Sequence, residues 1–140
     1  MIVPEIKQIE VSPTRVTIRS QGFVADRVIP IGNAPAGRRE PSLQGNSMGH
    51  WEGARLVVET TEFSPNRVGN AIGVQSGKGK HLVESFELNE ARTQLVYRFT
   101  LTDPQFLSEP VAEEQPWNYR PDLHYSQDPC DAQSAKRFLN

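Results

Sequence analysis

Apolar and polar residues alternate along most of this 140-residue chain, and this two-residue period limits its fold more than any other feature. Successive side chains of a β-strand point to opposite faces, so alternation predicts strands that bury one face and expose the other. In residues 14–20, for example, Val16 and Ile18 share one face and polar residues occupy the other. Similar strands are predicted over residues 4–11, 23–31 and 108–119, and the prolines of the last are typical of an edge strand.

A first β-hairpin is predicted over residues 47–60. Gly53 suits the first central position of a two-residue type II′ turn, which would join the two extended halves. This register places Trp51, Leu56 and Val58 on one face, which we assign to the core.

A second hairpin is predicted over residues 81–102. Its register opposes Glu84 to Phe99 and Phe86 to Tyr97, so that the apolar residues of both strands lie on one face. Glu84 is the one charged residue on this apolar face.

Two connections are unusually long, residues 32–46 and 64–80, and both are rich in Gly, Pro, Ser and cationic residues. If the strands run alternately up and down, both connections lie at one end of the sheet together with the corner at residues 103–107. Such an elaborated end is where β-barrels hold ligands. The sequence therefore predicts a single mainly β domain over residues 1–140, an antiparallel up-and-down barrel or half-barrel that is lipocalin-like.

The C-terminus departs from this pattern and predicts one short helix. Asp128 and Pro129 suit the N-cap and the first helical position. Apolar residues then follow at helical spacing, namely Ala132, Ala135, Phe138 and Leu139. We expect this helix to lie against the sheet or its end.

Composition argues against several classes of protein. The net charge of −2 excludes a globally basic nucleic-acid binder, and no apolar run approaches the roughly 20 residues of a membrane-spanning helix. Cys130 is alone and the three histidines lack the spacing of metal ligands, so we expect no metal and no cofactor. The first residues do not resemble a signal peptide, which indicates a cytoplasmic protein, or a periplasmic or secreted one if an upstream signal was removed.

Residues 45–63 read GNSMGHWEGARLVVETTEF. This stretch resembles a family of uncharacterised bacterial proteins with the signature G-x-x-x-G-x-W-E-G-x-x-L-V-V-x-T-x-x-F. The HLVESF segment at residues 81–86 and the acidic-proline corner at residues 103–104 resemble the family too, and the likeness spans residues 15–110. The activity of the family is not known, so the resemblance implies a shared fold and no chemistry. Many members are exported.

Glu84 is the strongest candidate for catalysis, because a carboxylate among apolar side chains is suited to proton transfer. The alternative is a structural acid that pairs with Arg27 or another cation. Tyr97, His81 or His50 would polarise a substrate beside Glu84, and ordinary surface positions are the alternative for both histidines.

Ligand-binding candidates are the aromatic residues of the strands and the cations of the first long connection, namely Trp51, Phe86, Phe99, Trp117, Tyr119, Arg38 and Arg39. Lys78 and Lys80 add positive charge to the second long connection and would attract an anionic ligand.

Three functions remain open. The favoured hypothesis is a domain that binds a small, largely apolar molecule in a barrel cavity, entered at the end with the long connections. The first alternative is a cofactor-free isomerase, cyclase or lyase that uses Glu84 in the same cavity. The second is a structural domain that forms a homodimer through an exposed edge strand near residues 111–119. None of the three involves nucleic acid or a membrane.

Overall fold

The computed structural model describes residues 7–20, 23–32 and 39–125. These residues form strands and no helix, and the predicted C-terminal helix lies outside the described residues. The strands are β1 (Lys7–Val11), β2 (Arg15–Ser20), β3 (Phe23–Pro30), β4 (Asn46–Glu52), β5 (Arg55–Thr61), β6 (Asn66–Ala71), β7 (Val74–Ser76), β8 (His81–Leu88), β9 (Gln94–Thr102) and β10 (Val111–Asn118). The mainly β, antiparallel prediction is confirmed.

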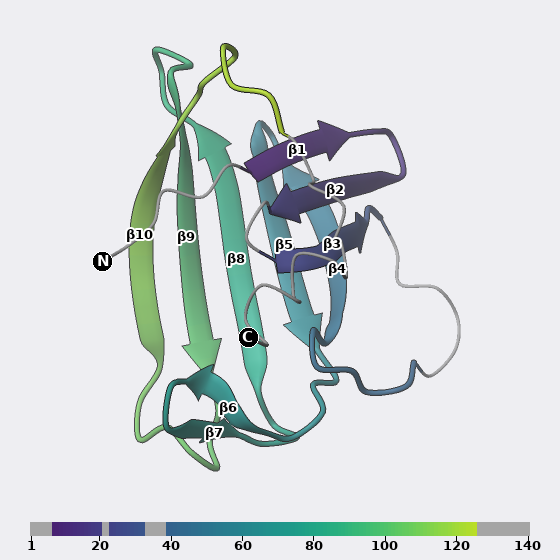
Figure 1. Cartoon of the computed structure of the whole chain (residues 1–140), viewed down its shortest axis with the longest axis vertical. Coiled ribbons are helices and arrows are strands. Elements are labelled where there is room, and N and C mark those ends of the chain that lie inside the picture. The colour runs from purple at the N-terminus through teal and green to yellow at the C-terminus, as the bar shows by residue number, and fades with distance from the viewer. Residues whose placement is uncertain (1–6, 21–22, 33–38, 126–140) are drawn as a thin grey trace, which may run out of the picture.

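Five strands form the larger sheet, in the order β10-β9-β8-β5-β4, and every neighbouring pair is antiparallel. Both predicted hairpin registers are confirmed, since Trp51 pairs with Leu56 and Glu84 pairs with Phe99. Gly53 has a φ of 62°, as the first central residue of a type II′ turn requires. The hairpins β4–β5 and β8–β9 turn at the same end of the sheet (Figure 1).

Strands β1, β2 and β3 form a second sheet that lies across the β4–β5–β8 part of the larger one (Figure 1). Its last strand reaches β4 where Ile31 bridges Gly49. A side chain at Gly49 would collide with this crossing, because a Cβ there would lie 2.8 Å from Cδ1 of Ile31. The core fills the space between the sheets and consists of Val16, Ile18, Ile29, Leu56, Val58 and Phe86.

The two sheets remain open at their edges, and no closed barrel is formed by the strands that the structure describes. Strand β10 is the free edge of the larger sheet, and it bears Glu113, Glu114 and Pro116. Charges and prolines are the usual means by which natural proteins discourage an edge strand from pairing with another chain. Within the described ranges, no helix has the length and apolarity to cross a membrane.

The second long connection differs from its prediction as a loop, because it folds into the hairpin β6–β7. Gly73 makes the tight turn possible with a φ of 80°, a conformation that suits glycine. The hairpin lies at the same end of the larger sheet as the β9–β10 connection (Figure 1). The second long connection and the corner at residues 103–107 therefore lie at one end of the sheet, as predicted, whereas residues 33–38 of the first long connection lie outside the described residues.

The prediction that Trp51 belongs to the core is wrong, because its side chain is 45% exposed. It shares the inner face with Leu56, as its register requires. Trp51 nevertheless lies next to the turn of the edge hairpin β4–β5, two residues beyond the bridge between Ile31 and Gly49, and its side chain stays open to solvent there.

Candidate functional site

Glu84 points to the inner face, as predicted, and its side chain is only 3% exposed. It forms an ion pair with Arg27 of β3, which donates from Nη1 to Oε1 at 2.8 Å and from Nη2 to Oε2. The Tyr97 hydroxyl donates to Oε1 at 2.9 Å. Both oxygens of Glu84 are thus occupied by hydrogen-bond donors, which is the structural alternative that the sequence left open.

Arg27 ties the two sheets together beyond its contact with Glu84. Its Nη2 also donates to Oγ of Ser47 at 3.1 Å and to Oγ1 of Thr60 at 3.0 Å. Burial lowers the pKa of Arg27, but the hydrogen bond and the charge of Glu84 outweigh burial and raise it overall. Burial raises the pKa of Tyr97, and the Glu84 charge adds to the increase, so Tyr97 stays protonated as a donor. The charged groups of Glu84 and Arg27 in this cluster thus have hydrogen-bond partners, and their ion pair joins the smaller sheet to the larger one.

Three predicted ligand residues lie together beside this cluster. Phe86, Phe99 and Trp117 line the inner face with Tyr97, and ring centroids are 4.7 Å apart for Tyr97 and Trp117 and 5.0 Å for Phe86 and Tyr97. Phe86 is buried, whereas the other three keep part of their surface exposed. The aromatic row extends the core toward β10.

The remaining predicted residues do not join Glu84. His50 and His81 lie on the outer face of the sheet, where each contacts an exposed acid: Glu52 at 3.2 Å and Glu59 at 2.7 Å. The prediction that either histidine would act beside Glu84 is therefore not supported by the geometry. Tyr119 is 66% exposed beyond the end of β10, Arg39 is half-buried, and Arg38 lies outside the described residues.

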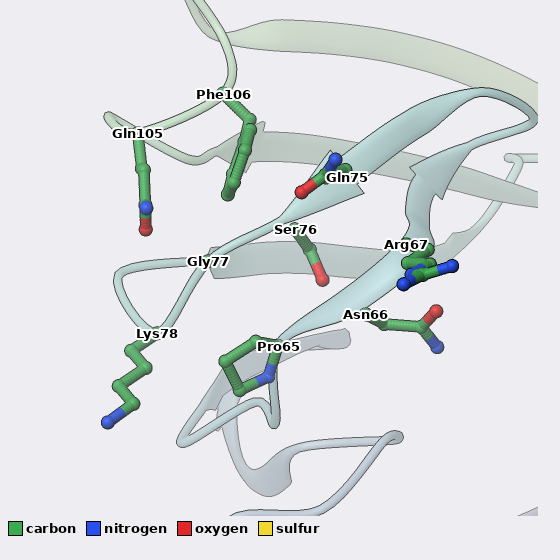
Figure 2. Close-up of a pocket in the computed structure, with 9 residues that line it drawn as sticks. All are labelled: Pro65, Asn66, Arg67, Gln75, Ser76, Gly77, Lys78, Gln105 and Phe106. Carbon is green, nitrogen blue, oxygen red and sulfur yellow. The ribbon is translucent and has the colours of Figure 1, made fainter.

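An open cleft of about 460 Å³ lies at the elaborated end of the sheet, between β6–β7 and the corner that follows β9. Its lining consists of Pro65, Asn66, Arg67, Gln75, Ser76, Gly77, Lys78, Gln105 and Phe106. Figure 2 shows Gln105 and Phe106 extending from the corner toward β7, and the Ser76 side chain pointing between the strands toward Pro65 and Asn66. Arg67 and Lys78 lie on opposite sides of Ser76 in this view.

Asp103 does not line this cleft, but it contacts the lining residue Gly77 and is only 1% exposed. Its Oδ2 accepts hydrogen bonds from the Gly77 backbone N–H at 2.8 Å and from Nδ2 of Asn70 at 2.9 Å. Burial alone would raise the pKa of Asp103, but these hydrogen bonds lower it overall. The carboxylate therefore joins the segment that follows β7 to the corner that follows β9.

Lys80 anchors the same hairpin from the other side. Its Nζ donates to the Gly69 carbonyl and lies 4.7 Å from the centroid of the Phe63 ring. Burial lowers the pKa of Lys80, and the nearby charge of Asp103 offsets part of that effect. The predicted role of Lys80 as a free loop cation is thus replaced by a structural one.

The polar side chains that line the cleft are mostly unpartnered, unlike those of the Arg27 cluster. Among the residues that the structure describes, the side chains of five make no hydrogen bond and no ion pair: Arg67, Gln75, Ser76, Lys78 and Gln105. Two of the five are cations, and no acid lines the cleft. Hydrogen-bonding capacity and positive charge are therefore available to a ligand.

Sequence reasoning missed most of these residues. It identified the segment by its length and noted Lys78, but it did not name Arg67, Gln75, Ser76, Gln105 or Phe106. The signal that could have found them was the acidic-proline corner at residues 103–104, because an acid directly after a strand is a natural anchor for the preceding connection. Within the described ranges, no group of three or more His, Cys, Asp or Glu residues could hold a metal ion.

Fold and geometry together define this chain as an antiparallel β protein with an open polar cleft at one end of its larger sheet. No protein-family profile matches the chain, and neither a curated protein nor a solved structure is significantly similar to it.

Proposed function

We propose that this protein binds a small molecule that bears an acidic group, and that the ligand lies in the cleft between β6–β7 and the corner at residues 105–106. The observation that supports this best is the unpartnered polar lining with two cations and no acid. A volume of about 460 Å³ falls within the usual range of small-molecule sites.

The proposal keeps the small-molecule hypothesis and the predicted end of the sheet, but it changes the character of the ligand. A largely apolar molecule would have to use the inner aromatic row, where Phe86 is already buried against the core. The cleft instead offers Arg67 and Lys78 for an anion, which would be attracted even though the chain is negative overall. The enzyme alternative loses its general base, because Arg27 and Tyr97 occupy both oxygens of Glu84.

Amide spectra of the ¹⁵N-labelled protein would test the proposal, with benzoate as the anionic probe and benzyl alcohol as its uncharged match. We expect benzoate to shift the signals of Ser76, Gly77 and Gln105, and benzyl alcohol to bind at least about 5-fold more weakly. Arg67→Gln should weaken benzoate binding, because the substitution removes an unpaired cation from the cleft wall.

Arg15→Gln is the matched control, because Arg15 is exposed on β2 and its side chain makes no hydrogen bond within the described chain. The proposal fails if benzoate shifts only residues of the inner aromatic row such as Phe99 and Trp117. It also fails if neither probe shifts any signal at millimolar concentration.

A further inference from the structure

The cleft is lined by three kinds of group that one ligand could contact at the same time: planar side-chain amides, an exposed apolar surface and cations. Gln75 and Gln105 each present a free amide. Asn66 uses its Oδ1 to accept the Val68 backbone N–H at 3.1 Å, which leaves its Nδ2 available. A side-chain amide offers donors and an acceptor in one plane, an arrangement that matches two adjacent hydroxyl groups on a ring.

The apolar part of the lining comes from Phe106 and Pro65. Phe106 is 37% exposed although it is a large aromatic residue, and Pro65 is exposed as well. An exposed aromatic face carries partial negative charge and attracts weakly polarised C–H groups, such as those on one face of a pyranose ring. Because only one ring lines the cleft, a flat aromatic ligand could be stacked on one side only.

The cleft is open to solvent rather than enclosed, so a bound ligand would keep part of its surface in water. This suits a molecule with polar groups on every side. It does not suit an apolar molecule, which gains most from complete burial.

From these observations we infer that the ligand is an acidic sugar, a pyranose that carries a carboxylate. This inference rests on the proposed function. Gln75 and Gln105 bind the hydroxyl groups, Phe106 packs against the C–H face of the ring, and Arg67 or Lys78 pairs with the carboxylate.

Calorimetric and NMR titrations with glucuronate, glucose, benzoate and adenosine monophosphate test the sugar class. Glucuronate should bind at least about 5-fold more tightly than either glucose or benzoate, because glucose lacks the charge for the cations and benzoate lacks the hydroxyl groups for the amides. Gln105→Ala should weaken glucuronate binding by about 3- to 10-fold, the effect of one lost hydrogen bond, and should weaken benzoate binding less, because benzoate has no hydroxyl group for the amide to bind. Phe106→Leu keeps an apolar wall without the aromatic face and should also weaken glucuronate binding.

The outcomes separate this inference from the proposed function. If benzoate or adenosine monophosphate binds in the cleft more tightly than glucuronate, the sugar class is wrong and the anion-binding function stands. If Gln105→Ala weakens the binding of benzoate and of glucuronate equally, the Gln105 amide does not bind the hydroxyl groups of the sugar, and the inference is again overturned. If no anion shifts the signals of Ser76 and Gly77, the proposed function itself is wrong.

Discussion

Glu84 and Arg27 show how one residue pair can join two sheets. Glu84 comes from β8, Arg27 from β3, and the hydroxyl groups of Tyr97, Ser47 and Thr60 complete the hydrogen bonds. A buried charge pair of this kind is costly to assemble, and it becomes strongly destabilising when one partner is removed. The lone acid on an apolar face is thus explained by a cation that lies 57 positions away along the chain.

The first prediction concerns this pair. Glu84→Gln should lower the free energy of unfolding by about 2–3 kcal/mol, since it leaves Arg27 largely buried without a counter-charge. The value lies below that of a fully buried pair because the Arg27 side chain is 25% exposed. Urea denaturation would measure the change.

The double variant Arg27→Met with Glu84→Leu provides the control. We expect it to recover most of the lost stability, because it removes both charges together. If Glu84→Gln is as stable as the parent protein, then Arg27 is not held by Glu84 in solution.

A second prediction at this scale concerns Asp103 and pH. Its folded pKa lies below the value of about 3.9 for an aspartate in an unfolded chain. The ionised carboxylate therefore stabilises the fold above pH 4, and the contribution is lost as the pH falls through the folded pKa. Unfolding free energies measured by urea between pH 7 and pH 2.5 should fall more steeply for the parent protein than for Asp103→Asn.

Glu109→Gln serves as the comparison, because Glu109 is exposed and makes no ion pair within the described chain. At pH 7 we expect Asp103→Asn to be less stable by about 1–3 kcal/mol, since an amide cannot accept from Gly77 and Asn70 as the carboxylate does. Equal pH profiles for the parent and Asp103→Asn would contradict this account.

At the scale of elements, the hairpin β6–β7 depends on close contact between its two strands. Gly69 allows this contact, because a Cβ there would overlap Oγ and Cβ of Ser76 on the facing strand. The same contact directs Ser76 between the strands, where it lines the cleft. Gly69 thus permits the strand contact beside the cleft, although it does not line the cleft itself.

Gly69→Ala should force the strands of this hairpin apart and disturb the cleft. We expect a loss of about 1–3 kcal/mol in stability, as for other substitutions that overpack a contact, and weaker benzoate binding. Gly79→Ala is the matched control, because its added Cβ would meet only Cδ of Pro104 at an ordinary 3.7 Å. Thermal unfolding and the NMR titration would measure both effects, and equal behaviour of the two variants would exclude the proposed contact.

At the scale of the whole molecule, the core is shared between the two sheets. Val16, Ile18 and Ile29 come from the smaller sheet, and Leu56, Val58 and Phe86 come from the larger one. Neither set forms a closed core without the other, because each sheet has a single apolar face toward the interior. The two sheets should therefore unfold together.

Ile29→Ala tests this cooperativity, since Ile29 is completely buried on β3. We expect a loss of about 3 kcal/mol, with one transition reported alike by tryptophan fluorescence from the larger sheet and by far-ultraviolet circular dichroism. The neighbouring Val28→Ala should cost less than about 1 kcal/mol, because Val28 is 51% exposed. Two separate transitions for Ile29→Ala would show that the sheets fold independently.

The sequence predicted the strands well because their signal is local. Alternation marked β2, and the turn chemistry around Gly53 determined the register of β4 and β5. The alternation of residues along β8 also predicted that the side chain of Glu84 points to the inner face. Exposure was harder to predict. The side chain of Trp51 lies on the inner face, as the alternation predicts, yet its burial depends on where the smaller sheet crosses the larger one.

Alternation and turn residues determined the strands and registers of the two predicted hairpins, β4–β5 and β8–β9, and the face on which their side chains lie, because each of these depends on neighbours within a few positions. Only the tertiary structure decided how the small sheet crosses the large one, which cation neutralises Glu84, and that residues 65–67, 75–78 and 105–106 meet around one cleft. These features depend on contacts between segments far apart in the chain, and no local period encodes them.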